Sequence, residues 1–148
     1  MLGERRLAAY AGEAVPEPPG QDRQPVIMAC VGPWPGMEPL IRRAAALAAG
    51  VDGQFRVATV RPAQPDAGAE QPLAGYAALT EQLGGEFVDL AGPSVAAALV
   101  GYASREQVTE LVLERRPNQA GRYPVLRELA RLARDVELHV LPASQVQS

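Results

Sequence analysis

The chain has 148 residues, a formal net charge of −3 and 47% hydrophobic residues, which suits one globular domain with a substantial core. The slight acidity predicts no general affinity for nucleic acid or anionic membranes, and no apolar run approaches the ~20 residues that span a bilayer. All 14 basic residues are arginine, which excludes a P-loop lysine and a Schiff-base lysine.

The termini and the single cysteine bound the domain and its setting. Cys30 lies in an apolar run and can form no disulfide within the chain, which favours a reduced, cytoplasmic environment. The first residues are charged and lack the apolar core of a signal peptide. Residues 1–24 contain several helix-breaking prolines and are expected to form a tail or linker. The folded domain is predicted over residues 25–142, and residues 143–148 are a polar C-terminal tail.

Apolar segments of strand length alternate with segments of helical periodicity along the domain. The expected strands cover residues 26–31, 55–60, 86–91, 108–113 and 136–141, and the expected helices cover residues 37–49, 73–83, about 93–103 and 124–134. The first strand is continuously apolar, as in central strands buried on both faces, whereas the third is less apolar and is expected nearer an edge. This alternation predicts right-handed crossovers, a parallel sheet and an α/β fold.

Glycine and proline punctuate these elements. Gly50 is expected to end the first helix, and Pro93 is expected at the first helical position of the third. A corner rich in Gly, Pro and Trp, residues 32–36, joins the first strand directly to a helix. Open α/β sheets bind ligands at the carboxyl ends of their strands, which predicts a ligand site over this corner.

Several segments have the character of one known family. The most specific is Leu-Ile-Arg-Arg-Ala at residues 40–44, within the longer stretch 30–49; residues 83–92, 95–103 and 108–112 accompany it. Together they resemble the universal stress protein fold, and more closely the version found in potassium-responsive sensor histidine kinases of the Kdp system. The likeness covers about residues 25–141. It implies a Rossmann-like, five-stranded parallel sheet of order 3-2-1-4-5 with helices on both faces.

The resemblance implies a non-catalytic regulatory or sensory module with a degenerate adenine-nucleotide site that takes ATP or cyclic di-AMP. A histidine kinase or another signalling protein is the implied partner, and the chain is either an excised domain or a stand-alone relative. The alternative is an interaction or dimerisation module that binds no nucleotide. Many stress-protein domains pair through their last strand, which corresponds to residues 136–141 and implies a homodimer.

The first two strand ends depart from the family's ligand-binding motifs. Gly32 and Trp34 occupy the positions of a Ser-x-Ser motif, so two hydroxyl donors are replaced by a hydrogen atom and a large ring. Trp34 is a stacking platform for adenine, a lid over a closed crevice, or a partner contact. After the second strand, where cyclic di-AMP binders carry Phe-Thr-Ala-x-Tyr, only Phe55 fits. Glu38 lies in the first helical turn, where it already satisfies the helix dipole.

After the fourth strand, Glu114 stands where nucleotide-binding stress proteins carry the first glycine of Gly-x-x-Gly. The arginines that follow suit a phosphate or an acidic partner, or are simply solvated. The candidate nucleotide-binding residues are Gly32, Pro33, Trp34, Gly36, Thr59, Arg61, Arg115, Arg116, Gly121 and Arg122. His139 is expected to be structural. The sequence spacing predicts no catalytic residues, no metal ligands and no paired carboxylates.

Overall fold

The computed structural model describes residues 24–61, 70–117 and 120–142, with Glu70 described by its backbone alone. The predicted tails at 1–24 and 143–148 lie outside the described residues except for Gln24, and so do residues 62–69 after the second strand. In chain order the elements are β2 (Val26–Cys30), α1 (Glu38–Gly50), β3 (Gln54–Arg61), α2 (Glu70–Gln82), β4 (Glu86–Ala91), α3 (Val95–Glu106), β5 (Glu110–Glu114), α4 (Pro124–Leu132) and β6 (Glu137–Leu141).

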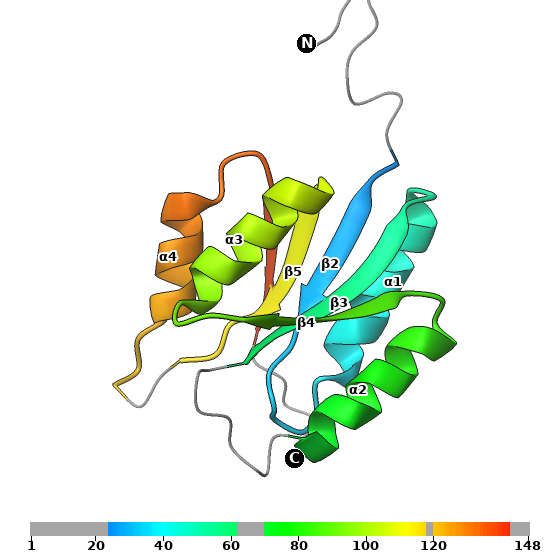
Figure 1. Ribbon diagram of the computed structural model, residues 1–148, viewed down its shortest axis with the longest axis horizontal. Helices are drawn as coiled ribbons and strands as arrows, with labels where there is room; N and C mark the ends of the chain where they lie inside the picture. The colour runs from blue at the N-terminus through cyan, green and yellow to red at the C-terminus, as the bar shows by residue number, and fades with distance from the viewer. Residues whose placement is uncertain (1–23, 62–69, 118–119, 143–148) are drawn as a thin grey trace, which may run out of the picture.

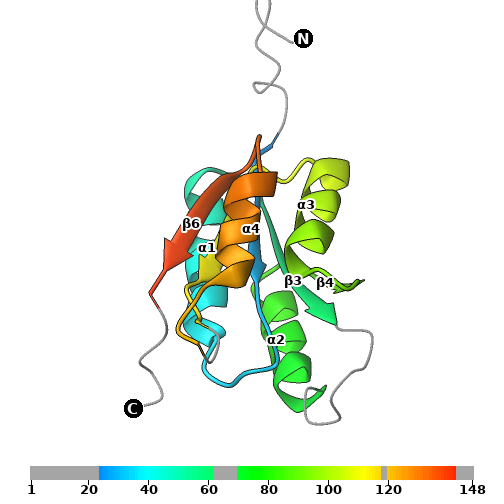
Figure 2. The same ribbon diagram turned by 90° about the vertical axis from the view of Figure 1, so that its left-hand side faces the viewer.

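The strands of the described residues form one parallel sheet of order β4-β3-β2-β5-β6 (Figure 1). This confirms the predicted α/β fold and the order 3-2-1-4-5. The edge position expected for residues 86–91 is also confirmed, because β4 pairs only with β3 in this sheet. Figure 2 views the molecule from the β6 edge of the sheet, with β6 and α4 nearest the viewer.

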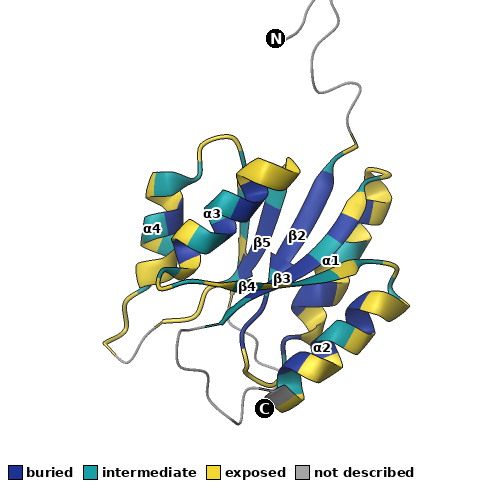
Figure 3. Ribbon diagram, in the orientation of Figure 1, coloured by how far each residue is buried: buried dark blue, intermediate teal, exposed yellow. Residues whose placement is uncertain are grey.

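Strand β2 supplies side chains to a separate core on each face of the sheet. Ile27 and Ala29 pack with α1 and α2, whereas Met28 packs with α3 and α4. All three residues are fully buried, which is the alternation that a strand imposes on successive side chains. Figure 3 shows the result: β2 and β5 are buried, while the outer faces of the helices are exposed.

The end of α1 corrects the role expected for Gly50. Gly50 is the last helical residue, and the chain reverses at Asp52, which has a positive φ of 56°. The Gly53 amide then closes the turn on the Ala48 carbonyl at 2.8 Å. A Cβ at Gly53 would lie 2.6 Å from the Pro25 carbonyl oxygen, so close backbone approach demands glycine at this position instead.

The start of α3 corrects the role expected for Pro93. Ser94 is the N-cap: it has an extended backbone, and its hydroxyl accepts a hydrogen bond from the Ala97 amide at 3.1 Å. Pro93 therefore precedes the cap, because the serine satisfies an otherwise unpaired amide of the first turn.

Other boundaries shift by one to three residues from those expected, and residues 86–91 agree fully. One shift of three residues is at α2, which begins at Glu70 instead of residue 73. Pro72 is accommodated there because the first helical turn has no intrahelical partner for its missing N–H. Among the described residues, no helix has the length and apolarity needed to cross a bilayer.

Candidate functional site

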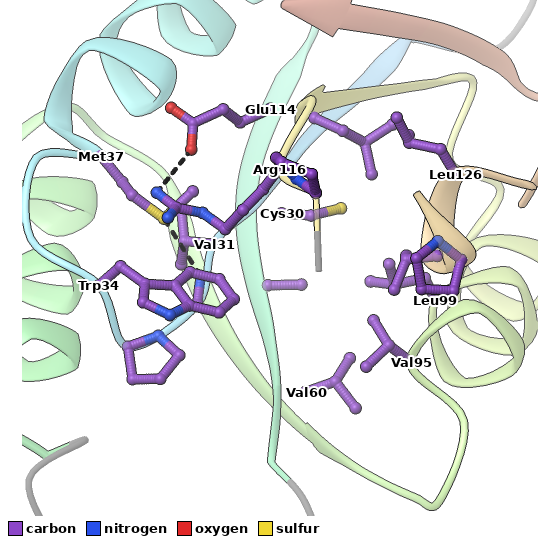
Figure 4. Close-up of a pocket in the computed structure, with 17 residues that line it drawn as sticks. Cys30, Val31, Trp34, Met37, Val60, Val95, Leu99, Glu114, Arg116 and Leu126 are labelled. Atoms are coloured by element: carbon purple, nitrogen blue, oxygen red, sulfur yellow. Dashed lines mark hydrogen bonds and ion pairs between the residues drawn. The ribbon is translucent and has the colours of Figure 1, made fainter. Parts of the chain in front are cut away.

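A cavity of about 310 Å³ opens at the carboxyl ends of β2 and β5. The chain order reverses between these two neighbouring strands, which makes the cavity a topological switch point of the sheet. Open α/β sheets bind ligands at such points. The loops after β2 and β5 and the first turns of α3 and α4 enclose the cavity (Figure 4).

The inner wall of the cavity is apolar. Cys30, Ala58 and Val60 line it from the sheet, and Leu99 lines it from α3. Leu99 is fully buried in the core beneath α3 and α4, so the cavity wall is continuous with that core. A wall of this composition suits a flat or apolar group better than a highly charged one.

The rim of the cavity carries exposed apolar side chains. Trp34, Val95 and Val125 line the cavity and are three of the five large hydrophobic residues exposed in the described part of the chain. They come from three separate segments: the loop after β2, the start of α3 and the start of α4. Figure 4 shows Trp34 across the opening from Val95. Apolar side chains gathered around a cavity mark a surface that a ligand or a partner covers.

The ring of Trp34 lies directly against the backbone of Gly32. A Cβ placed on Gly32 would lie 1.9 Å from Cζ3 of that ring, far inside van der Waals contact. Only glycine leaves room for the ring in this position. The two positions that replace the family's serines are therefore coupled, since the tryptophan ring fills the space that a side chain at Gly32 would need.

Tyr76 of α2 fixes the loop that carries this tryptophan. Its hydroxyl donates to the Trp34 carbonyl and accepts from the Met37 amide, the latter at 3.2 Å. Burial raises the pKa of the Tyr76 hydroxyl above its ordinary value, so it remains a donor at neutral pH. The Gly32 amide donates to Sδ of Met37 at 3.3 Å, which engages the second amide after β2.

An ion pair covers the tryptophan from the β5 side. The guanidinium of Arg116 lies 4.5 Å from the centre of the Trp34 ring, and one of its nitrogens contacts Oε1 of Glu114 at 2.9 Å. The Glu114 side chain is only 5% exposed, so its carboxylate stands beside the cavity largely shielded from water. Glu114, Arg116 and Trp34 thus form one connected group at the mouth of the cavity (Figure 4).

Cys30 contributes a thiol to the cavity. Burial raises its pKa to about 12, well above the ~8.5 of an exposed cysteine. The thiol therefore stays protonated at neutral pH, and a thiol is a far weaker nucleophile than a thiolate.

Four of the ten predicted nucleotide-binding residues line the cavity: Gly32, Pro33, Trp34 and Arg116. The other six lie outside its lining: Gly36, Thr59, Arg61, Arg115, Gly121 and Arg122. The predicted residues that line the cavity therefore lie mainly on its β2 side, with one on its β5 side.

Strand alternation explains why Thr59 and Arg61 are excluded. Ala58 and Val60 point into the cavity, so the intervening Thr59 points to the other face of the sheet, where it is 2% exposed. Arg61 forms an ion pair with Asp89 of β4 at 2.7 Å.

The remaining residues belong to the neighbouring loops. The Arg115 guanidinium lies 5.8 Å from the centre of the Tyr123 ring, away from the cavity. Gly36 and Gly121 both have positive φ, at 86° and 77°, and shape the loops after β2 and before α4. Arg122 lies in the second of these loops.

Comparison with known proteins identifies solved structures of the same fold. No family model matches the chain, and no curated protein matches it. Among solved structures, a universal stress protein in complex with cAMP matches with a TM-score of 0.64 at 16% identity, over 82% of this chain and 99% of that one. A universal stress protein of Lactobacillus plantarum matches with a TM-score of 0.60 at 11% identity, over 80% and 98%. One of Archaeoglobus fulgidus in complex with dAMP matches with a TM-score of 0.56 at 16% identity, over 79% and 96%.

The chain has the universal stress protein fold. In this fold, sequence reasoning missed the apolar half of the site, namely Val95, Leu99, Val125 and Leu126. Hydroxyls, arginines and glycines are the groups that hold phosphate, whereas these residues resemble ordinary helix core. The sequence indication was a valine in the first turn of each helix, Val95 in α3 and Val125 in α4, and the structure leaves both exposed.

Sequence reasoning also missed a polar cluster on β5 and β6. Parallel register pairs Glu110 with Glu137, and His139 lies beside both, with Nε2 at 2.8 Å from Glu110 and 3.9 Å from Glu137. The three side chains could reach a common metal ion. No sequence spacing predicts the cluster because the two carboxylates come from different strands. The close contact with Glu110 also gives His139 a structural partner.

The packing of Trp34 on Gly32 can be tested with Gly32→Ala. Trp34 is the single tryptophan of the chain, so its fluorescence reports on this ring alone. The added methyl group cannot fit beneath the ring, and we expect a red-shifted emission and greater quenching by acrylamide as the ring moves into water. Gly50→Ala is the matched control, since its Cβ would meet no atom within 4 Å. An unchanged emission spectrum for Gly32→Ala would show that the ring does not pack there.

Proposed function

We propose that this domain is a non-catalytic regulatory module that binds an adenine nucleotide in the cavity at the switch point. The observation that carries the proposal is a 310 Å³ cavity at the carboxyl ends of β2 and β5. Small-molecule sites typically begin at about 300 Å³. Two solved proteins of this fold are described in complex with cAMP and with dAMP, which supports an adenine nucleotide as the ligand class.

In this proposal the adenine ring lies between Trp34 and the first turns of α3 and α4. Trp34 remains 43% exposed beside the Arg116 guanidinium, and Val95 and Leu126 offer aliphatic contacts across the opening. Stacking of a base on an aromatic side chain contributes about 1–3 kcal/mol. ATP and cyclic di-AMP are the ligands that the sequence resemblance adds to the two found in solved relatives.

The chemistry of the cavity supports binding without catalysis. The Cys30 thiol is protonated at neutral pH, and the Glu114 carboxylate is held by Arg116. A nucleophile needs a partner that removes its proton, and a general base needs a free pair of electrons aimed at the substrate. Neither group is arranged in this way.

Titration calorimetry with ATP, cAMP, dAMP and cyclic di-AMP tests the proposal. We expect saturable binding of at least one ligand, weakened about tenfold in Trp34→Ala because a stacking surface is lost. Val51→Ala is a control of the same exposed apolar type, since Val51 lies at the C-cap of α1 and does not line the cavity. Absence of heat with all four nucleotides would contradict the proposal.

We further propose that the ligand-bound module regulates a sensor histidine kinase of the Kdp type. The support is the Leu-Ile-Arg-Arg-Ala segment at residues 40–44. In α1, Leu40, Ile41 and Ala44 are buried, whereas Arg42 and Arg43 are exposed and could dock on an acidic partner surface.

A chimeric kinase tests this context. We expect a Kdp-type kinase that carries residues 24–142 in place of its own stress-protein domain to keep ligand-dependent autophosphorylation. Reversing both charges, in Arg42→Glu with Arg43→Glu, should abolish the response while leaving ligand binding intact. A chimera indifferent to the ligand would contradict the kinase context.

A second candidate function is pairing of two copies through β6. In the sheet of described residues, β6 pairs only with β5, so its outer edge presents backbone groups, and Val140 on this strand is 42% exposed. Light scattering is expected to give the mass of a dimer that Val140→Lys converts to a monomer, because a charge on an edge strand opposes edge-to-edge pairing. Val51→Lys should leave the dimer unchanged, and a monomeric wild-type protein would contradict pairing.

A further inference from the structure

The charges that face the cavity cancel each other. Among the described residues that line it, Glu114 and Arg116 carry the only full charges, and they lie 2.9 Å apart. Glu114 is nearly buried, so water screens its carboxylate weakly and its field acts strongly on any second anion brought to Arg116. A phosphate approaching the guanidinium would therefore meet a carboxylate already bound to it.

The backbone at the mouth of the cavity is also engaged. A phosphate cradle after a β-strand uses backbone amides approached closely over glycines. Here the Gly32 amide donates to Met37 Sδ, and the Trp34 ring covers this glycine. Glu38 and Pro39 begin α1, which puts a negative charge in the first turn and removes one amide donor.

We propose that this site recognises the flat, uncharged part of its ligand, the nucleobase with its sugar, and gains no affinity from phosphate. Glu114 is the residue that sets this selectivity, because it neutralises Arg116. The inference rests on the proposed adenine-nucleotide site and names the part of the ligand that this site reads. The apolar wall and Trp34 supply the attraction. The Glu114–Arg116 pair removes the gain in affinity that a free arginine would give to a negatively charged ligand.

Binding of adenosine, AMP and ATP to the wild-type protein, followed by Trp34 fluorescence and calorimetry, tests the inference. We expect the three dissociation constants to agree within about threefold, because a neutralised arginine provides no net charge-assisted hydrogen bond to phosphate. AMP or ATP binding at least roughly tenfold tighter than adenosine would overturn the inference and leave the proposed function standing. Failure of all three ligands to bind would overturn both.

Glu114→Gln tests the residue responsible. The amide keeps the shape and can still contact Arg116, but the guanidinium charge is no longer neutralised. We expect the preference for AMP over adenosine to rise roughly tenfold, as one charge-assisted contact to phosphate becomes favourable. Glu128→Gln is the matched control, because Glu128 pairs with Arg131 on α4 and does not line the cavity. An unchanged preference in folded Glu114→Gln protein would overturn the assignment to Glu114.

Arg116→Gln provides a second measurement if circular dichroism shows that Glu114→Gln does not fold. Removing the cation takes away the Arg116 contact of the Glu114 carboxylate, so AMP should bind roughly tenfold more weakly than adenosine. Equal binding of AMP and adenosine to this variant would overturn the charge balance on which the inference depends.

Discussion

Strand β2 is buried on both faces of the sheet, and this burial determines the course of the chain that follows it. Ile27, Met28 and Ala29 are fully buried, and hydrogen-bonded strands flank them on both sides. A strand enclosed in this way can leave the sheet only at its end. The chain therefore emerges at residues 31–37 in the crevice between the two helical layers, and whatever side chains follow β2 must fill or line that crevice.

The Trp34 ring lies against Gly32, and Tyr76 ties the loop to α2 through Trp34 and Met37. The packing of the loop at residues 31–37 therefore determines which groups of a ligand the crevice can bind. Because these contacts hold the loop, few of its backbone amides are left to bind a phosphate. The cavity is closed on its polar side and lined with aliphatic groups on its other side. It therefore suits a flat ring.

The sequence predicted the sheet well because the evidence for it is local. A continuous apolar run identified β2 as central, and the weaker apolarity of residues 86–91 identified β4 as an edge. The family resemblance supplied the strand order. Helix ends were predicted less well: Gly50 and Pro93 had the right residue types, but the close approach of Gly53 to Pro25 and the Ser94 cap determined where the chain turns.

For the candidate site, the sequence predicted a location, since a strand that runs through Gly32 and Pro33 into a helix must present its corner at the carboxyl edge of the sheet. It also determined the loss of the hydroxyl donors. The packed fold was needed to show that Thr59 faces away, that Val95 and Val125 join Trp34 at the rim, and that Glu114 neutralises Arg116. Apolarity and chain direction follow from neighbouring residues in the sequence, whereas the direction of side chains and the pairing of charges depend on strand register and on helices far apart in the chain.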